Sequence, residues 1–486
     1  MGLAFPPEDG GRGDDSAAAA EFDVVVVGFG IAGGCAAVEA GAAGASVLVL
    51  ERAAVAGGTS ALAGGHFYLG GGTVVQRATG HADSADAMYA YLMAVTPDPE
   101  PEKLRAYADG SVEHCDWLEG LGFEFERSFY PEKAVIQPQT QGLMYTGNEK
   151  VWPYRELAAP APRGHKVPVP GDTQGAKLVI GLLERRAAEL GVEVWFETGV
   201  TELVTDGSKV TGVRWRSFDQ TGTVRARNVI LAAGGFVMNG EMVAEHVPQL
   251  ARKPFVLGTT YDDGMGIKLG LSAGAQALHM DQAFITAPFY PPGQLLTGIV
   301  VNRDGKRFVA EDSYHSRTSG FVLDQPGSVA YLVVDSAHMA YPEFPLVPFI
   351  DGWETIAEME DGLGIPAGNL AATLSAYNAD AARGEDREFH KHPDWLAPQD
   401  AGPWGAFDLS LGKAVYAGFT LGGLRCTVDG QVQRADASIV AGLYAAGACA
   451  SNIAQDGKGY SSGTQLGEGS FFGRRAGRHA ALQVRS

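Results

Sequence analysis

A tyrosine and two serines stand among glycines in the stretch GKGYSSG, residues 457–463. The hydroxyl groups of Tyr460 and Ser462 could donate or relay protons, and a phenol, with an ordinary pKa of about 10, is a better hydrogen-bond donor than a serine hydroxyl. The same residues could instead form a turn and the N-terminal cap of the segment that follows, since serine is a preferred capping residue. From the local sequence both interpretations stay open.

The elements that would position such a site begin near the N-terminus, where the sequence has the pattern of a dinucleotide-binding unit. The β-branched run DVVVV, residues 23–27, is typical of a buried parallel strand, and an alanine-rich segment with helical spacing follows it. Between them three glycines have G-x-G-x-x-G spacing: Gly28, Gly30 and Gly33. They allow a tight turn, the approach of a pyrophosphate and close helix packing. A second apolar run ends in Glu51, an acid that could bind a ribose.

Further glycine clusters favour a flavin over a nicotinamide. GGTSALAGG, residues 57–65, follows the ribose acid directly, and a flavin needs backbone N–H groups to hold its long ribityl chain and ring system. Two more strand-like runs end in small residues, ARNVILAAGGF (226–236) and ADASIVAGLYAAGACA (435–450), and would complete the same domain. We therefore predict FAD. A nicotinamide-binding Rossmann protein and a regulatory flavoprotein without turnover are the alternatives.

Length, charge and cysteine usage limit the remaining classes of protein. At roughly 150 residues per domain, 486 residues predict two or three domains. A net charge of −20 disfavours nucleic acid and anionic lipid as partners. The four cysteines form no CxxC pair and no histidines form an HExxH motif, so we expect no metal and a reducing, cytoplasmic compartment. Residues 1–20 predict a flexible tail, and no apolar run predicts a membrane span.

Several of these motifs together resemble the flavoprotein superfamily of fumarate reductases, succinate dehydrogenase flavoprotein subunits and 3-ketosteroid dehydrogenases. The resemblance covers nearly the whole chain from Glu21 and includes GGTSALAGG, VVNRDGKRFVAED, TLGGLRCTVDGQV, GLYAAGAC and the closing glycine-rich segment. It implies an α/β fold, in which a split Rossmann-like FAD-binding domain carries an inserted α+β substrate-capping domain. The implied domain boundaries are 21–280 and 411–486 for the FAD domain and 281–410 for the cap.

Two departures separate the chain from the dicarboxylate branch of this superfamily. GGTSALAGG has no histidine at the position that carries the flavin covalently in the membrane-complex enzymes, so the resemblance implies non-covalent FAD. In AGFTLGGL, Phe419 stands where those enzymes have a histidine that holds a substrate carboxylate. A phenylalanine can line an apolar pocket but cannot pair with a carboxylate.

Within the superfamily, the segments EDSYHSR and GKGYSSG are most similar to 3-ketosteroid dehydrogenases of the Δ4-(5α) type. The resemblance places a catalytic trio on Tyr314, Tyr460 and Ser462. In this assignment Tyr460, with a backbone N–H near Gly463, donates to the ketone oxygen, Ser462 accepts the α-proton, and Tyr314 relays it towards solvent. Phe419, Tyr460 and Gly463 would contact the substrate. Tyr314 could equally be a surface tyrosine on its local sequence.

The same resemblance assigns residues to the cofactor along the whole FAD domain. The glycines of the closing segment, from Gly463 on, would let the backbone lie near the flavin ring. Ala448 stands where relatives often have an acid or an amide. The full cofactor set is Gly28, Gly30, Ile31, Ala32, Gly33, Glu51, Arg52, Gly58, Thr59, Ser60, Gly64, Gly65, Val200, Ala233, Gly234, Gly447, Ala448, Gly463, Thr464 and Leu466.

The implied activity is FAD-dependent formation of a C4–C5 double bond in a 5α-reduced 3-ketosteroid. The substrate would be a small apolar ketone, and the sequence does not identify the electron acceptor. A Δ1-type ketosteroid dehydrogenase and a flavin-dependent enoate reductase are the alternative enzymes. Aromatic residues among prolines, including Phe284 and Phe349, are typical of rigid loops around an apolar pocket, although core packing explains them as well.

Overall fold

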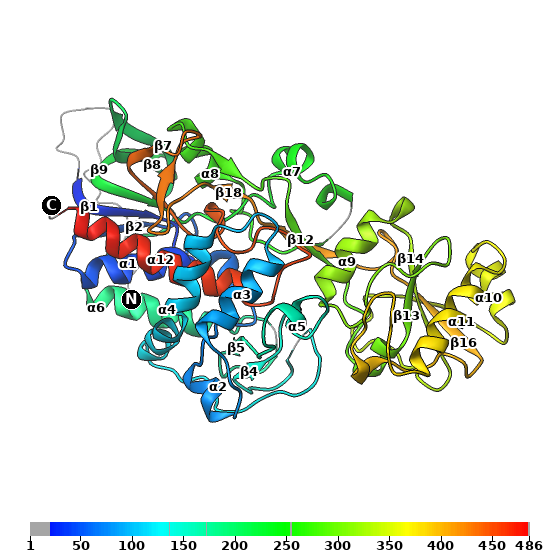
Figure 1. The fold of residues 1–486 in the computed structure, drawn as a ribbon. Coiled ribbons are helices and arrows are strands. Elements are labelled where there is room, and N and C mark those ends of the chain that lie inside the picture. The colour runs from blue at the N-terminus through cyan, green and yellow to red at the C-terminus, as the bar shows by residue number, and fades with distance from the viewer. Residues whose placement is uncertain (1–19, 136, 172, 253–254, 485–486) are drawn as a thin grey trace.

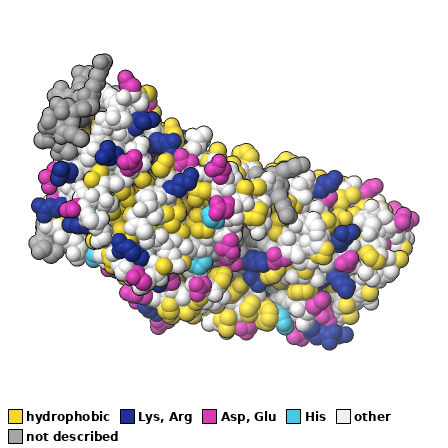
Figure 2. All heavy atoms as spheres, turned by 90° about the horizontal axis from the view of Figure 1, so that it is seen from above, with side chains coloured by type: hydrophobic (Ala, Val, Ile, Leu, Met, Phe, Trp, Pro, Cys, Tyr) yellow, Lys and Arg dark blue, Asp and Glu magenta, His cyan; other side chains and the backbone are white. Residues whose placement is uncertain are grey.

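The computed structural model describes residues 20–135, 137–171, 173–252 and 255–484, and has a larger α/β body joined to a smaller lobe (Figure 1). The expected flexible tail lies outside the described residues, except that Ala20 already begins the first strand. Among the described residues, no helix is both long and apolar enough to cross a membrane. On the face drawn in Figure 2, acidic and basic side chains are interspersed across both parts.

The body is built on an eight-stranded sheet whose strands come from both ends of the chain. Its main path is β19–β20–β9–β1–β2–β6, and β8 extends from β9 with β7 beyond it. The strands are β1 (Ala20–Val27), β2 (Val47–Leu50), β6 (Glu193–Trp195), β7 (Gly199–Asp206), β8 (Lys209–Ser217), β9 (Gln220–Leu231), β19 (Gln431–Gln433) and β20 (Ile439–Ala445).

The register of this sheet aligns the ends of four parallel strands. Val27 pairs with Leu50 on one side and with Leu231 on the other, and Leu231 also pairs with Ala445. The predicted strands at 23–27, 46–50, 226–236 and 435–450 are therefore confirmed as neighbours. Because their carboxyl ends meet at one edge, the glycine-rich turns that follow them converge there, where open α/β sheets bind their ligands.

Three helices pack beside the parallel strands: α1 (Ile31–Ala42), α6 (Lys177–Glu189) and α12 (Thr464–Gln483) (Figure 1). A Cβ atom added at Gly473 would overlap the carbonyl oxygen of Ala32, and one at Gly477 that of Ala36. These two glycines thus let α12 lie directly against the backbone of α1. Close packing against α1 is thus a reason for glycine at these two positions that the sequence interpretation, which placed the glycines of this helix near the flavin ring, did not include.

A helical layer and a small sheet complete the body. Residues of α3, α4 and α12 share one apolar cluster, and the small sheet has the order β3–β5–β4. These elements are α2 (Val74–Ala78), α3 (Ala85–Val95), α4 (Pro101–Gly120), α5 (Tyr154–Leu157), β3 (His66–Tyr68), β4 (Leu143–Met144) and β5 (Gly164–Lys166).

The smaller lobe contains an antiparallel sheet of order β13–β14–β16–β15, with an apolar cluster between it and two helices. A buried ion network also holds it together, since Arg307 pairs with both Glu311 and Asp386 at 2.8 Å. The elements are β13 (Ile299–Asn302), β14 (Ala330–Asp335), β15 (Phe349–Trp353), β16 (Trp404–Asp408), α9 (His315–Asp324), α10 (Ile356–Leu363) and α11 (Asn369–Ala381).

Short strands connect the lobe to the body. Both β10 and β12 pair with β17, and β11 pairs with β18, so segments before and after the lobe meet at its base. Within this junction Phe284 of β12 lies opposite Phe419 of β17. The elements are β10 (Phe255–Val256), β11 (Ala277–Leu278), β12 (Ala283–Thr286), β17 (Ala417–Thr420), β18 (Gly423–Leu424), α7 (Gly240–His246) and α8 (Met265–Ser272).

Candidate active site

The turn between β1 and α1 has the geometry of a dinucleotide cradle. Gly28 has φ +98°, a conformation that favours glycine, and a Cβ at Gly33 would overlap the carbonyl oxygen of Gly28. Gly30 is the N-cap of α1 and offers no capping side chain. The N–H groups of the first helical turn therefore point out of the helix without intrahelical partners, as a phosphate site requires.

Glu51 lies at the end of β2, beside this turn. Its two carboxylate oxygens accept backbone N–H groups, Oε2 from Phe29 and Oε1 from Ala53, each at 2.7 Å. Burial raises the pKa of Glu51, and these backbone donors oppose that effect. Two fixed donors hold the carboxylate at the sheet edge, where its remaining lone pairs could accept ribose hydroxyls.

The glycine cluster after β2 folds back over the start of α1. Gly57 donates its N–H to the Phe29 carbonyl at 2.7 Å, and Ser60 Oγ accepts the Ile31 N–H at 3.1 Å. Thr59 Oγ1 donates to Asp262 and accepts the Thr259 N–H at 2.9 Å. A Cβ at Gly58 would meet open space. The cluster thus forms a wall with free space beside its backbone, which fits a bound dinucleotide.

The other predicted cofactor residues lie at the ends of the elements that converge on this edge. Gly64 and Gly65 precede β3, Ala233 and Gly234 follow β9, Gly447 and Ala448 follow β20, and Gly463, Thr464 and Leu466 begin α12. Val200 is buried in β7, near the segment where Thr198 donates its N–H to the Glu51 carbonyl at 2.9 Å, and Arg52 pairs with Asp263 at 2.5 Å. Their roles towards FAD remain predictions.

The structure brings the three predicted catalytic side chains together, although Tyr314 is 148 residues from Ser462 in the sequence. The hydroxyl groups of Tyr314 and Ser462 are hydrogen-bonded at 2.5 Å. Tyr314 is 3% exposed and Tyr460 is 6% exposed, and both belong to one small apolar cluster. The interpretation of Tyr314 as a surface tyrosine is therefore wrong.

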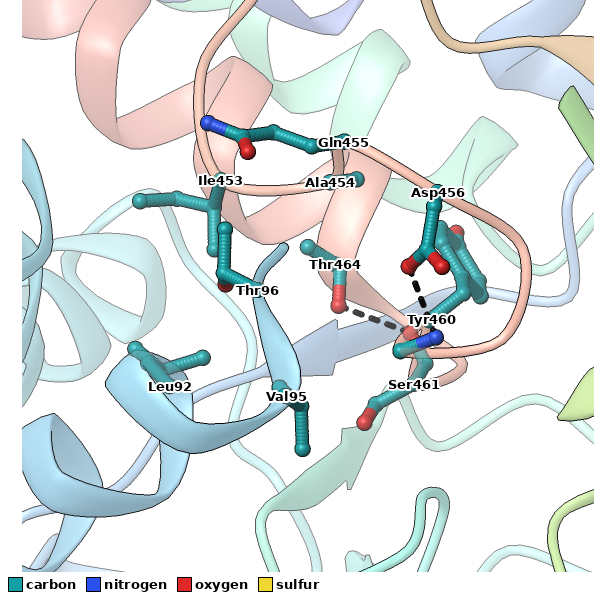
Figure 3. A pocket seen from close by; sticks show the side chains of 11 residues that line it. Leu92, Val95, Thr96, Ile453, Ala454, Gln455, Asp456, Tyr460, Ser461 and Thr464 are labelled. Atoms are coloured by element: carbon teal, nitrogen blue, oxygen red, sulfur yellow. Dashed lines mark hydrogen bonds between the residues drawn. The ribbon is translucent and has the colours of Figure 1, made fainter. Parts of the chain in front are cut away.

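Tyr460 lies on the turn before α12, where Figure 3 shows it and Ser461 pointing away from the turn in different directions. The Tyr460 hydroxyl oxygen accepts the Gln465 N–H from the first turn of α12 at 3.4 Å. Burial raises the pKa of Tyr460, which keeps the phenol protonated. The oxygen is thus a helix-terminal acceptor while its own proton stays available for donation. Capping and donation, the two interpretations left open by the sequence, are compatible at this residue.

The two serines beside Tyr460 do not cap the helix; Gly463 is the N-cap residue. Ser462 bonds Tyr314 through its hydroxyl, and its N–H donates to the Thr146 carbonyl at 2.8 Å. Ser461 Oγ instead bonds the Tyr91 hydroxyl at 3.1 Å, and its carbonyl accepts the Thr464 hydroxyl at 2.7 Å (Figure 3). Ser461 is therefore a structural residue.

Two phenylalanine rings pack against Tyr460. Phe284 and Phe419 are stacked with ring centres 4.8 Å apart, and the Phe284 ring lies edge-on to Tyr460 at 4.8 Å. Phe419 is thus placed where a flat apolar substrate could contact it. Phe349, which carries the same sequence signal, is 37% exposed on β15 and contacts Tyr341 and Phe407 instead. The expectation of a pocket wall is wrong for Phe349.

His315 follows Tyr314 and keeps the surroundings of the trio uncharged. Its ring lies 3.9 Å from the Tyr314 ring, and its Nδ1 is hydrogen-bonded to Thr286 Oγ1 at 2.5 Å. Burial, with a smaller contribution from Lys133, lowers the pKa of His315 to about 3. The imidazole is therefore neutral near pH 7 and adds no charge next to the hydroxyl pair.

Tyr314 also borders a polar cleft of about 110 Å³ that opens towards the surface. Its walls include the buried Asp312 and the partly buried Lys133, and its rim includes the exposed Glu132 and Lys150. Burial lowers the pKa of Lys133 to about 8 and raises the pKa of Asp312. A polar space of this size can hold several waters, so it could connect Tyr314 with solvent.

Two buried polar residues of this region were not predicted from the sequence. Asn148 is fully buried between the segments that carry Tyr314 and Ser462. Glu468 is buried on α12, where its Oε2 accepts the N–H groups of Ile453 at 2.6 Å and Ala454 at 3.1 Å. A carboxylate within the small-residue segment GEGS was a usable signal for Glu468, whereas Asn148 lies in a stretch without a motif.

Replacing Glu468 by glutamine should change the pH dependence of stability. Burial raises the pKa of Glu468 from 4.5 to about 7, so between these values the folded chain holds a proton that the unfolded chain has lost. Stability therefore falls as pH rises through this window, by on the order of 3 kcal/mol. Glu468→Gln keeps an acceptor and lacks this loss, so its unfolding midpoint should rise relative to the native chain between pH 5 and pH 8. Parallel midpoint curves for the two proteins would contradict the assignment.

Comparison with known proteins places this site in a family context. The model of the FAD binding domain family matches residues 23–469. A crystal structure of 3-ketosteroid-Δ4-(5α)-dehydrogenase from Rhodococcus jostii RHA1, in complex with 4-androstene-3,17-dione, is 40% identical with a TM-score of 0.89, and the match covers 95% of this chain and 97% of that one.

Two curated relatives are less similar in sequence. The NADH:fumarate oxidoreductase of Klebsiella pneumoniae (strain 342) is 28% identical over 99% of this chain, which spans half the length of that relative. The 3-oxosteroid 1-dehydrogenase of Mycobacterium tuberculosis (strain ATCC 25618 / H37Rv) is also 28% identical, over 96% of this chain and 99% of the relative. The matches thus include both a reductase and steroid dehydrogenases.

Proposed function

The chain belongs to the FAD binding domain family and is an FAD-dependent oxidoreductase, and from this premise we propose that it introduces a C4–C5 double bond into a 5α-reduced 3-ketosteroid. The observation that carries the proposal is the hydroxyl pair of Tyr314 and Ser462, 2.5 Å apart, next to Tyr460 and the stacked Phe284 and Phe419. This arrangement suits a flat, apolar ketone better than a dicarboxylate.

Dehydrogenation of a saturated ketone removes a hydride and a proton from adjacent carbons. When bound, FAD supplies the hydride acceptor. Tyr460 donates its hydroxyl proton in a hydrogen bond to the ketone oxygen, which stabilises the developing enolate and makes the α-hydrogen acidic enough to remove. Gly463, at the N-terminus of α12, would add a backbone donor to the same oxygen.

The α-proton passes to Ser462. As the C–H bond breaks, the Ser462 oxygen gains the α-proton and gives its own hydroxyl proton to Tyr314, which passes its proton to water in the adjoining cleft. Serine alone is a weak base, and the 2.5 Å contact to Tyr314 supports this concerted transfer. No charged side chain of the trio needs to be buried beside the apolar substrate, which would be costly.

We also propose the division of labour between the two parts of the chain. Residues 21–280 and 411–486 would form the FAD domain, and residues 281–410 the substrate-capping domain. The eight-stranded sheet, with strands from both ends of the chain, and the separate four-stranded sheet of the lobe support this division. Tyr314 would then come from the cap and Ser462 from the FAD domain, so the proton-abstracting pair forms between them.

Anaerobic reduction tests the proposed function. The purified protein should be yellow, and a saturated 5α-reduced 3-ketosteroid should bleach the flavin and yield a C4–C5 unsaturated product in mass and NMR spectra. Acid denaturation should release FAD into the supernatant, because no histidine is present to bind it covalently in the GGTSALAGG segment. A C1–C2 double bond would contradict the proposed position. A flavin that no ketosteroid bleaches, but that fumarate reoxidises, would contradict the substrate class.

A further inference from the structure

We propose that Asn148 is the positioning residue of the proton-abstracting pair: its side-chain amide ties the segment that carries Tyr314 to the loop that carries Ser462. The inference rests on the proposed function in assigning proton abstraction to this pair. The structural part of the inference is that Asn148 sets the contact between the Tyr314 and Ser462 hydroxyl groups. This part rests only on contacts seen in the folded chain.

The Asn148 amide uses both of its ends. Asn148 is fully buried, and its Oδ1 accepts the Tyr314 N–H at 2.9 Å. Its Nδ2 donates to the Lys458 carbonyl at 3.3 Å, in the loop that leads to Tyr460 and Ser462. Since Tyr314 is the N-cap residue of α9 and that helix start has no side-chain cap, the Asn148 oxygen fixes the point where α9 begins.

The backbone around Asn148 adds further ties to the loop. The Thr146 carbonyl accepts the Ser462 N–H at 2.8 Å. The Asn148 N–H donates to the Tyr91 hydroxyl at 2.9 Å, and that hydroxyl bonds Ser461 at 3.1 Å. A Cβ at Gly147 would overlap the Ser461 hydroxyl, so glycine is needed for this close approach. Three consecutive residues, 146–148, thus hold the Ser462 loop, while only the Asn148 side chain also holds Tyr314 among the contacts described.

The chemistry of an amide explains why asparagine suits this position. An amide can accept from one N–H and donate to one carbonyl at the same time, whereas an ionised carboxylate only accepts. The Tyr314 N–H and the Lys458 carbonyl are backbone groups of different segments, so a side chain that connects them must accept from one and donate to the other. Displacing the Tyr314 hydroxyl from Ser462 by about 1 Å would cost on the order of 100-fold in rate, since proton transfer needs close, aligned oxygens.

Two variants at this position separate the two halves of the bridge. Asn148→Asp, at a pH where its carboxyl is ionised, keeps the acceptor for the Tyr314 N–H and removes the donor to Lys458, and Asn148→Ala removes both. We expect turnover to fall about 10-fold in the first and about 100-fold in the second. The deuterium isotope effect with an α-carbon-deuterated ketone should rise in both, because proton abstraction becomes slower relative to the other steps. A purely structural role would lower the unfolding midpoint and leave the isotope effect unchanged.

The matched control is Asn378→Asp in the lobe. The Asn378 amide also bridges backbone groups, accepting the Gln399 N–H at 2.7 Å and donating to the Gln399 carbonyl at 3.2 Å. The same change in chemistry there should leave the isotope effect at the native value. An equal rise in the control would overturn the positioning role.

Crystal structures of the FAD-bound variants provide a readout that does not depend on the steroid. The Tyr314 and Ser462 hydroxyl oxygens should separate beyond hydrogen-bond distance in Asn148→Ala. If the alanine variant does not fold, the same separation is measured in Asn148→Asp. An unchanged contact with native turnover would overturn the inference. If ketosteroids fail to reduce the native enzyme, the proposed function fails, and the distance between the two hydroxyl groups still decides the structural inference.

Discussion

Tyr460→Phe is expected to lower turnover by about 10²–10³-fold while the protein still binds FAD. The phenylalanine keeps the ring that packs edge-on against Phe284 at 4.8 Å, and removes only the hydroxyl. Loss of the donor leaves the developing enolate oxygen without its strongest hydrogen bond. The rate of anaerobic flavin reduction by a saturated ketosteroid measures the effect, and the visible spectrum of the purified variant reports the bound flavin.

A second phenol serves as the control for the loss of a hydrogen-bonded tyrosine hydroxyl. Tyr331 of β14 donates to the Leu363 carbonyl at 3.3 Å within the lobe, away from the trio. Tyr331→Phe should therefore retain native turnover. If the flavin of the Tyr460→Phe enzyme is reduced as fast as that of the native protein, the assignment of Tyr460 as the donor to the ketone oxygen is contradicted.

Gly33→Val is expected to abolish retention of FAD. A Cβ at this position would overlap the Gly28 carbonyl oxygen and would lie 3.3 Å from the Ala232 Cβ. Both neighbours belong to the rigid sheet edge, so α1 would have to move away from the turn that is proposed to hold the pyrophosphate. We expect colourless protein, measured as the ratio of flavin absorbance to protein absorbance, and a lower unfolding midpoint.

Gly181→Val is the matched change in a neighbouring helix. Gly181 lies in α6, and a Cβ there would meet no other atom within 4 Å. Valine there should lower the free energy of unfolding by less than about 1 kcal/mol, because glycine has a lower helix propensity than valine. Retention of flavin by Gly33→Val at the level of Gly181→Val would contradict the cradle described for α1.

The parts of the fold that were predictable depend on short-range patterns. The strand before Gly28, the helix after it and the strand that ends at Leu231 are confirmed, because each is specified within about 30 residues by apolar runs and glycine spacing. Which strands become neighbours was predictable only from the order typical of nucleotide-binding domains. The polar segment around His165, by contrast, forms the buried strand β5, with His165 hydrogen-bonded to Thr73 at 2.7 Å.

The candidate site divides in the same way. The glycines and Glu51 indicate the dinucleotide cradle from the local sequence. Nothing near Tyr314 in the sequence indicates that Ser462 is its partner, and only the family resemblance connected the two residues. Phe284 and Phe349 carry the same composition signal and end in different places, since burial depends on which strand each residue faces. The role of Asn148 could not be predicted from the sequence, because it depends on two backbone partners that become its neighbours only in the folded chain.

The contact between α1 and α12 has a consequence for how the protein is made. The glycine face of α12 belongs against α1, but α12 begins 422 residues after α1 ends, at 464 against 42. At about 5–20 residues per second, a ribosome needs roughly 20–85 s to bridge that interval. During this time the inner face of α1 and the edge of β9 that later receives β20 lack their native cover. Capture of the flavin should therefore wait until α12 has left the ribosome, and the nascent chain should depend on chaperones until then.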